Sequence, residues 1–223
     1  MDLKEKKELV GYLLQYATDN KRKKIQEVIH KRTRHVTIVL EDVFQTHNAS
    51  AVVRSAECFG IQDMYVIEKR NEFKPVLGVA KGSSKWIDCH TFDNTTVCIK
   101  ELKKNGYKIV ATSPHKTSCF LHDLNIDNKT ALLFGTEAIG LSQEALDLSD
   151  EFVTIPMFGF TESFNISVSV AICLYDVMQR LRKSSLNWQL SDKEIIDIKL
   201  QWLRKIIPGV DIIERDFFKK KSQ

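Results

Sequence analysis

The stretch VTIVLEDVFQTHNASAVVRSAECFG, residues 36–60, decides the fold, because it joins two different hydrophobic patterns. Residues 36–40 form an unbroken β-branched and aliphatic run, which is typical of a strand buried on both faces of a sheet. Residues 48–59 instead repeat apolar side chains at three- and four-residue intervals, which is typical of a helix with one buried face. The stretch therefore predicts a buried strand, a polar loop and an amphipathic helix, in that order.

The same alternation of strand and helix patterns continues along the chain. Further strands are predicted at 64–67, 108–111, 131–134 and 152–155, with a weaker candidate at 86–92. Helical patterns at 95–105 and 142–147 fall between these runs. Alternation of this kind predicts an α/β fold with a mostly parallel sheet and helices on both of its faces.

The two ends of the chain carry helical patterns of their own. Residues 4–30 predict one or two amphipathic helices, and the capping box SDKE at 191–194 opens another helix that stops at Pro208 and Gly209. We therefore expect three parts: a basic helical N-terminal extension at 1–32, an α/β domain at 33–182, and a basic helical C-terminal extension at 183–223.

The helical segment 166–181 is apolar almost all round in its first three turns. Such a helix must be covered on more than one side. Part of the cover can be the core of the same chain and part a second copy, so the pattern predicts a homodimer. The alternative is a helix that is completely buried within one chain.

The formal net charge of +4 hides an uneven distribution. Residues 1–34 and residues 180–223 carry +5 each, whereas residues 35–179 carry −6. Basic ends on an acidic middle favour a polyanion such as nucleic acid as the partner of the terminal segments.

Several classes of protein are excluded or disfavoured by composition. No apolar stretch approaches the roughly 18 to 20 residues needed to span a bilayer, and the N-terminus lacks the apolar core of a signal peptide. The five cysteines form no C-x-x-C pair and are typical of a reducing cytoplasm, where we expect the protein to act. His115, Cys119 and His122 lie close in sequence, but without a second cluster they are interpreted as loop residues, and no metal is expected.

Three loops that follow predicted strands are rich in polar groups, and parallel sheets bind ligands at this edge. The loops are 41–48, the glycine loop 135–140, and 156–165. The glycine loop has P-loop spacing, but the pair Leu141-Ser142 stands where Lys followed by Ser or Thr is required, so the Lys is lacking, and no G-x-G-x-x-G occurs. The glycines still allow main chain to approach a flat ligand, which favours a nucleoside-like cofactor held by backbone groups.

Individual polar residues in these loops also admit simpler explanations. Arg54 is opposite the apolar face of its helix and could be a solvated surface side chain, Asn48 could be a helix N-cap, and Glu137 could be a solvated turn residue. Against these explanations, all three follow strands of one sheet, as do Ser163 and Asn165, and could converge.

Three motifs resemble those of the SpoU/TrmH family of SPOUT RNA 2′-O-methyltransferases. NASAVVRSAECFG at 48–60 resembles the first family motif, N-x-x-A-x-x-R-x-A-x-x-F-G. LFGTEAIGLS at 133–142 resembles the second, and IPM at 155–157 continuing to SFNISVS at 163–169 resembles the third. The match covers about residues 36–182 with the motifs in the family's order. Phe164 departs from the Leu that the family often has there.

The resemblance implies a C-terminal trefoil knot that binds S-adenosylmethionine, and a dimer that completes each active site. It implies that Arg54 is essential for activating the ribose 2′-hydroxyl, either as a base or by positioning an RNA phosphate that accepts the proton. Asn48 and Glu137 would support that group, and Ser163 and Asn165 would shape the catalytic pocket. The residues implied to hold the cofactor are Gly135, Ile155, Phe164, Thr112, Met157 and Gly140.

The substrate must be selected outside the motifs. The short helical ends resemble those of family members that methylate the guanosine at tRNA position 18. The candidate phosphate contacts are Lys21, Arg22, Lys23, Lys24, Arg32, Arg34, Arg180 and Arg182. The alternatives are another tRNA site, an rRNA loop, or a non-catalytic dimeric RNA-binding module.

Overall fold

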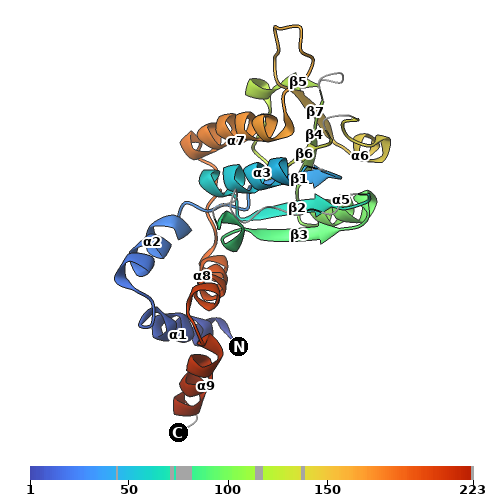
Figure 1. Ribbon diagram of the computed structural model, residues 1–223. Coiled ribbons are helices and arrows are strands. Elements are labelled where there is room, and N and C mark those ends of the chain that lie inside the picture. Colours follow the sequence, from blue (N-terminus) through green and yellow to red (C-terminus); the bar gives the residue numbers. More distant parts are fainter. Residues whose placement is uncertain (44, 71–72, 74–81, 114–117, 137–138, 222–223) are drawn as a thin grey trace. The chain divides into compact units, whose positions relative to one another are not determined.

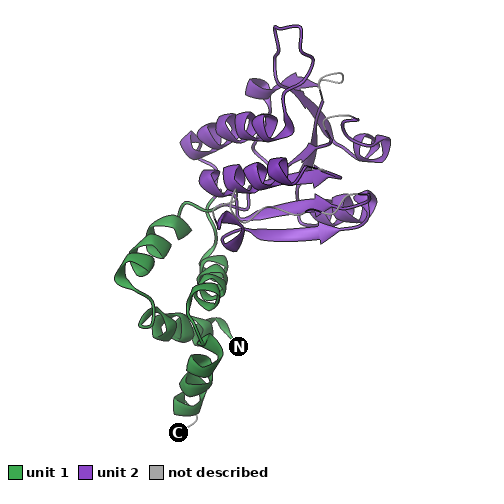
Figure 2. Ribbon diagram, viewed as in Figure 1, with its two compact units in different colours: residues 1–32, 189–223 green, residues 33–188 purple. Residues whose placement is uncertain are grey.

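The computed structural model describes residues 1–43, 45–70, 73, 82–113, 118–136 and 139–221. The chain forms two compact units, which Figure 2 shows in different colours. One unit contains residues 33–188, and the other contains both ends of the chain, residues 1–32 and 189–223. Each unit is described separately below.

The larger unit is built on a parallel sheet, as predicted. Seven strands of the described chain pair in the order β3-β2-β1-β6-β4-β7-β5, and every pairing is parallel (Figure 1). The strands are β1 (Val36–Glu41), β2 (Asp63–Ile67), β3 (Asp88–Phe92), β4 (Lys108–Thr112), β5 (Cys119–Phe120), β6 (Thr130–Phe134) and β7 (Glu151–Thr154). The weak candidate at 86–92 is thus a real strand, whereas the two-residue β5 was not predicted.

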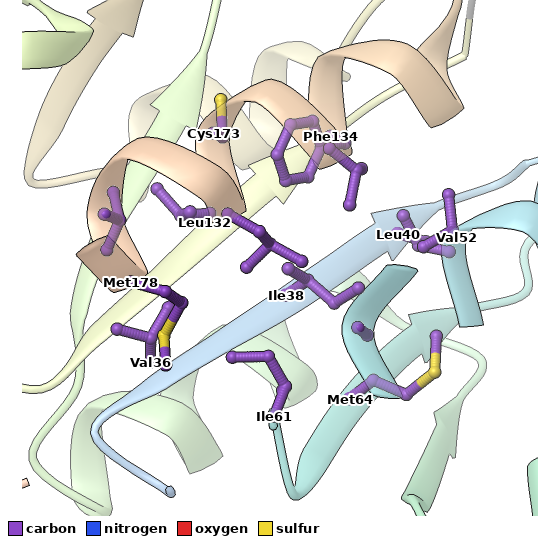
Figure 3. Packing of buried hydrophobic residues seen from close by; sticks show 14 of the residues in the cluster. Val36, Ile38, Leu40, Val52, Ile61, Met64, Leu132, Phe134, Cys173 and Met178 are labelled. Carbon is purple, nitrogen blue, oxygen red and sulfur yellow. The ribbon is translucent and has the colours of Figure 1, made fainter. Parts of the chain in front are cut away.

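Helices cover both faces of this sheet, which confirms the α/β prediction. On one face, α3 (Thr46–Phe59) and α7 (Ile166–Lys183) pack against each other and over Ile38 and Leu40 of β1. Figure 3 shows this core, with Leu132 and Phe134 of β6 beneath α7. The other core gathers Val39, the alternate residue of β1, with side chains of α5 (Thr95–Lys104) and α6 (Gln143–Asp147). Successive side chains of a strand point to opposite faces, so one β1 segment serves both cores.

One face of α7 is not covered within the described chain. Residues such as Val170, Leu174 and Val177 are buried in the core, but Val168 is 43% exposed and Tyr175 is 62% exposed. The alternative of a helix completely buried within one chain is therefore wrong.

The smaller unit is helical and joins segments far apart in sequence. It contains α1 (Leu3–Leu14), α2 (Asp19–Ile29), α8 (Asp192–Ile206) and α9 (Val210–Lys221). The capping box predicted at the start of α8 is present between Ser191 and Glu194. Helix α1 contacts both α8 and α9, and Lys6 Nζ lies 2.5 Å from Asp197 Oδ1. The sequence patterns did not show that the two ends pack together.

The short turns η1 (Ser83–Lys85) and η2 (Leu121–Asp123) complete the described elements. No helix in the described ranges is both long enough and apolar enough to cross a membrane.

Candidate cofactor pocket and active site

The carboxyl ends of the central strands bring the three polar loops to one edge of the sheet. Leu40 of β1 pairs with Phe134 of β6, so the loops that follow these two strands start side by side. Ala111 of β4 pairs with both Leu133 of β6 and Phe152 of β7, which places the end of β7 two strands away from β6. This edge is where an open parallel sheet binds ligands.

A pocket lies at this edge between the ends of β4 and β7 and the start of α7. Its described lining consists of Thr112, Ser113, Val153, Ile155, Met157, Ser163, Phe164 and Ser169. Five of these residues were predicted: four as cofactor contacts and Ser163 as a catalytic residue. Ser113, Val153 and Ser169 were missed, although Ser113 lies only two residues after the predicted strand at 108–111.

The glycine loop closes on itself rather than lying open. The Thr136 amide donates to the Gly140 carbonyl at 3.1 Å, and the Gly140 amide donates to the Thr136 carbonyl at 2.8 Å. A Cβ on Gly135 would lie 2.1 Å from the Gly140 carbonyl carbon, and Gly140 has a φ of 73°. Both glycines are therefore required by the fold of the loop itself. The described lining of the pocket does not include them.

Asn48 and Asn165 come together from two different motifs. Asn165 Nδ2 donates to Asn48 Oδ1 at 3.1 Å, and Asn48 Nδ2 donates to Gln45 Oε1 at 2.9 Å. Asn165 also caps α7, because its Oδ1 accepts from the Ser167 amide at 2.9 Å. Helix α3 begins at Thr46 with Gln45 at its N-cap, so the N-cap explanation for Asn48 is wrong. Asn48 is buried, only 5% exposed.

Arg54 lies on the exposed side of α3, as its helical phase predicted. Its guanidinium makes no hydrogen bond or ion pair with any residue that the structure describes. Ser163 is exposed at the rim of the pocket. Glu137 lies outside the described residues, so its predicted place beside Arg54 stays a prediction. The structure therefore joins Asn48 to Asn165 and places Ser163 in the pocket.

A left-handed turn leads from β1 towards α3. Asp42 has a φ of 59°, a conformation that few residues other than glycine adopt. Its carboxylate accepts from the Arg70 backbone amide and from Arg70 Nε, each at 2.7 Å. These bonds hold the turn, and neither Asp42 nor its neighbour Glu41 was singled out from the sequence.

The predicted phosphate contacts differ in what their side chains already bind. Lys21, Arg22, Lys23 and Lys24 are all exposed on α2, where Arg22 pairs with Asp19 and Lys24 Nζ lies 4.0 Å from Glu27 Oε2. The other four contact groups outside their own helical turn. Arg32 is buried 5.7 Å from the ring of Trp202, and Arg34 pairs with Asp63 and Asp88.

The last two predicted contacts lie on α7. Arg180 donates to the carbonyls of Leu121 and Leu124 and pairs with Asp176. Arg182 is exposed, donates to the carbonyl of Phe59 at 3.0 Å and stacks over Trp188. Together with the four exposed α2 cations, Arg182 remains open to solvent.

Within the described ranges, no group of three or more His, Cys, Asp or Glu side chains is placed to hold a metal ion. His115 lies outside those ranges. Cys119, its neighbour in the weak sequence cluster, points its thiol at Glu151 Oε1 at 3.6 Å. Burial is the main reason that the pKa of the Cys119 thiol is raised.

The parallel sheet and the pocket at its carboxyl edge define an α/β ligand-binding protein. Residues 35–175 match the model of the SpoU rRNA Methylase family, and the chain belongs to that family.

Relatives and solved structures agree with this assignment. The chain is 44% identical over 205 residues to tRNA (guanosine(18)-2′-O)-methyltransferase of Borreliella burgdorferi, covering 92% of this chain and 94% of the relative. The crystal structure of the A. aeolicus TrmH/SpoU tRNA modifying enzyme superimposes with a TM-score of 0.76 at 31% identity, covering 84% of this chain and 96% of that one.

A third comparison concerns the fold alone. The SpoU methyltransferase AviRb from Streptomyces viridochromogenes, solved in complex with the cofactor AdoMet, shares 20% identity with a TM-score of 0.63. The match covers 71% of this chain and 65% of that one.

Proposed function

We propose that this protein transfers a methyl group from S-adenosylmethionine to the ribose 2′-hydroxyl of the guanosine at position 18 of tRNA. The observation that carries the proposal is the clustering of predicted residues at one edge of the sheet. Thr112, Ile155, Met157, Phe164 and Ser163 line one pocket, and Asn165 is hydrogen-bonded to Asn48. The name of the B. burgdorferi relative, which aligns over nearly the whole chain, supports the reaction and the nucleotide.

The residues of the pocket fit S-adenosylmethionine. Val153, Ile155 and Met157 supply apolar wall for an adenine face, whereas Ser113 and Thr112 supply hydroxyls near the strand ends. The described lining contains no Lys or Arg that would repel a sulfonium. When bound, the cofactor supplies the electrophilic methyl group. Phe164 in place of the family's usual Leu keeps an apolar side chain in this wall.

Methyl transfer to a hydroxyl is an in-line displacement that requires alignment and the removal of one proton. Alignment alone can contribute several kcal/mol. Asn48 and Asn165 fix α3 against the first turn of α7, so the helix that carries Arg54 is held beside the pocket. The exposed guanidinium of Arg54 has five N–H donors and a permanent positive charge, which suits it to hold an RNA phosphate. We assign Arg54 this positioning of a phosphate that accepts the hydroxyl proton.

The uncovered side of α7 supports a homodimer. Val168 and Tyr175 on this helix are exposed, as are Phe158 and Phe160 in the loop before it. A second copy would bury these apolar side chains close to the pocket. We also propose that the C-terminal part of the α/β domain forms the trefoil knot that the family resemblance implies. The TM-score of 0.76 against the A. aeolicus enzyme supports this topology.

Binding of tRNA is assigned to the helical extensions. Residues 1–32 and 183–223 flank the catalytic domain 33–182 in this proposal, and the exposed run Lys21, Arg22, Lys23 and Lys24 supplies phosphate contacts. We propose that the protein acts in the cytoplasm, where tRNA is available.

A second candidate substrate is rRNA, since the family model is described as an rRNA methylase. A labelled methyl donor, offered with unmodified tRNA transcript or with total rRNA, separates the candidates. We expect label in tRNA, with nucleotide mapping to guanosine 18. Label only in rRNA would favour the second candidate. No label in either RNA, with no heat of cofactor binding in calorimetry, would indicate a non-catalytic RNA-binding module.

A further inference from the structure

Glu41 is a buried carboxylate at the carboxyl end of β1, with an exposed fraction of only 4%. Its Oε2 accepts from the Ser142 backbone amide at 2.8 Å. Its Oε1 accepts from Ser142 Oγ at 2.7 Å and from Thr95 Oγ1 at 2.5 Å, and Lys69 Nζ lies 3.8 Å from the same oxygen. Burying a carboxylate is costly unless its lone pairs are satisfied, and here both oxygens are engaged.

The Ser142 partner marks the point where the second motif ends. Ser142 is the N-cap of α6, and its Oγ accepts from the Ala145 amide at 3.2 Å. The glycine loop at 135–140 begins after Phe134, which pairs with Leu40, and only Leu141 separates its end from Ser142. Consecutive residues of β1, Leu40 and Glu41, therefore anchor the two ends of the loop.

Other contacts hold α6 more superficially. Lys69 Nζ lies 2.6 Å from Glu144 Oε2, and Thr96 donates to Glu144 Oε1 from its hydroxyl and its amide. The Glu144 side chain is partly exposed, whereas Glu41 is shielded from water. Water competes less for the bonds of Glu41, so Glu41 is the stronger of the two anchors.

Beyond Glu41, the chain runs through the left-handed Asp42 turn into α3, which carries Asn48 and Arg54. Glu41 is therefore hydrogen-bonded to the end of the second motif and precedes, along the chain, the helix of the first motif. We propose that Glu41 is a positioning residue that sets the glycine loop at the carboxyl edge of the sheet, so that cofactor and ribose meet in line. This inference rests on the proposed function and on the cofactor contacts that the family resemblance implies for Gly135 and Gly140.

Two variants of Glu41 test whether its hydrogen bonds are needed: one can keep them and the other cannot. In Glu41→Gln, the amide oxygen can accept from the Ser142 amide, and the NH₂ group can donate to the hydroxyls of Ser142 and Thr95. All three bonds keep a partner, and only the ion pair with Lys69 is lost. In Glu41→Leu, all three are lost at similar volume.

Two further variants serve as controls. Thr95→Val removes one bond to the same carboxylate without touching the tether to Ser142. Asp63→Asn alters another buried carboxylate, 5% exposed, at the amino end of β2. If Glu41 only stabilised the fold, Glu41→Leu would lower the melting temperature and leave the cofactor Kd unchanged, as we expect for Asp63→Asn.

The test measures the KM for S-adenosylmethionine, the KM for tRNA and the calorimetric Kd for the cofactor, with thermal melting to confirm folding. We expect Glu41→Leu to raise the KM and Kd for the cofactor at least about tenfold while the KM for tRNA changes little. Glu41→Gln and Thr95→Val should stay within about threefold of wild type, and Asp63→Asn should lower the melting temperature without changing the cofactor Kd. If Glu41→Leu fails to fold, Ser142→Ala removes the hydroxyl tether together with the N-cap bond to the Ala145 amide, and it should raise the cofactor Kd by more than the roughly threefold range allowed to Glu41→Gln and Thr95→Val.

The inference is overturned if folded Glu41→Leu, or Ser142→Ala in its place, binds the cofactor like wild type. It is also overturned if Asp63→Asn weakens cofactor binding equally. The proposed function fails separately, if wild type binds the cofactor but methylates no RNA, and the Kd comparison then still decides the role of Glu41. Wild type that binds no cofactor contradicts both.

Discussion

At the scale of single residues, Arg54 is the side chain on which the proposed chemistry depends most. It is exposed and has no polar partner among the described residues, whereas Arg34 and Arg180 are bound to carboxylates or carbonyls of the protein. A cation with no polar partner among the described residues is available to a substrate phosphate.

We therefore predict that Arg54→Ala lowers the rate of methyl transfer at least about 10²-fold, in the range seen when one charge-stabilising donor is removed. The cofactor Kd should stay within about twofold, because Arg54 is not in the described lining of the pocket. Lys104→Ala removes the same charge from α5, on the other face of the sheet, and should leave the rate unchanged. Near-normal turnover of Arg54→Ala would refute its assigned role.

A second residue cluster lies at the amino ends of β2 and β3. Asp63 Oδ2 lies 2.6 Å from Arg34 Nε, and Asp63 Oδ1 lies 3.0 Å from His90 Nε2. Burial acts to raise the pKa of Asp63, but the hydrogen bond from His90 and the charge of Arg34 outweigh it, so that pKa is lowered. The hydrogen bond to Asp63 raises the pKa of His90, with Asp88 adding to the effect and burial and Arg34 opposing it.

These directions predict a window of pH in which the pair stabilises the fold. The contribution of Asp63 is present above its ordinary pKa of 3.8 and is lost as pH falls through the lowered value. The contribution of His90 is present below its ordinary pKa of 6.5 and is lost as pH rises through the raised value. The free energies of unfolding of wild type and His90→Gln, measured with urea, should therefore differ most between pH 4 and 6.5 and become equal at pH 9. A difference in free energy of unfolding that grows as the pH rises would contradict the predicted loss of stabilisation.

Residue roles were predictable only where a motif carried them. The spacing of the motifs singled out Asn48 and Asn165, which the fold joins by a hydrogen bond. The same sequence could not separate the exposed Lys23 from the buried Arg32, because the partner of Arg32 is Trp202, far along the chain. Glu41 was missed for a related reason, since its partners Thr95 and Ser142 lie 54 and 101 residues away.

At the scale of elements, the spacing of apolar residues along the chain predicted the longer strands and the main helices. The run at 36–40 is β1, and the apolar segment at 166–181 is α7. Strand β5 was not predicted because two residues are too few to show a periodic hydrophobic pattern. Its pairing with β7 depends on the tertiary structure. The order of the strands in the sheet likewise depends on crossovers that periodicity does not encode.

The uncovered face of α7 leads to a prediction about assembly. Val168→Glu would bury a charge in the proposed dimer interface and should raise the dimer dissociation constant at least about tenfold. Methylation should fall at enzyme concentrations where the variant is monomeric. Val97→Glu is the matched control, because Val97 is 54% exposed on α5, against 43% for Val168 on α7. Light scattering that finds Val168→Glu as dimeric as Val97→Glu would argue against an interface on α7.

At the scale of the whole molecule, the two compact units differ in charge. The helical unit carries seventeen Lys and Arg against eleven Asp and Glu, whereas the sheet-containing unit carries sixteen against eighteen. The sequence showed that both ends are basic, and the fold shows that they belong to one unit. The knot, by contrast, comes from the family resemblance alone, whereas the dimer is predicted both by the apolar pattern at 166–181 and by the resemblance.

This separation of charge predicts different salt dependence for the two ligands. The tRNA affinity should fall linearly with salt on logarithmic axes, while the cofactor affinity should scarcely change. Lys23→Ala should lower the slope for tRNA by about one unit, since one phosphate contact is lost. Filter binding across salt concentrations measures both slopes. If the tRNA affinity did not depend on salt concentration, phosphate contacts would not be its main source.

The most direct test of the proposed reaction compares two tRNA substrates that differ by one oxygen atom. One carries guanosine at position 18 and the other carries 2′-deoxyguanosine there, and both are incubated with the protein and labelled S-adenosylmethionine. We predict that the first accepts about one methyl group per molecule in the presence of excess enzyme, and that the second accepts none above background. Equal labelling of the two substrates would contradict the assignment of the 2′-hydroxyl of guanosine 18 as the acceptor.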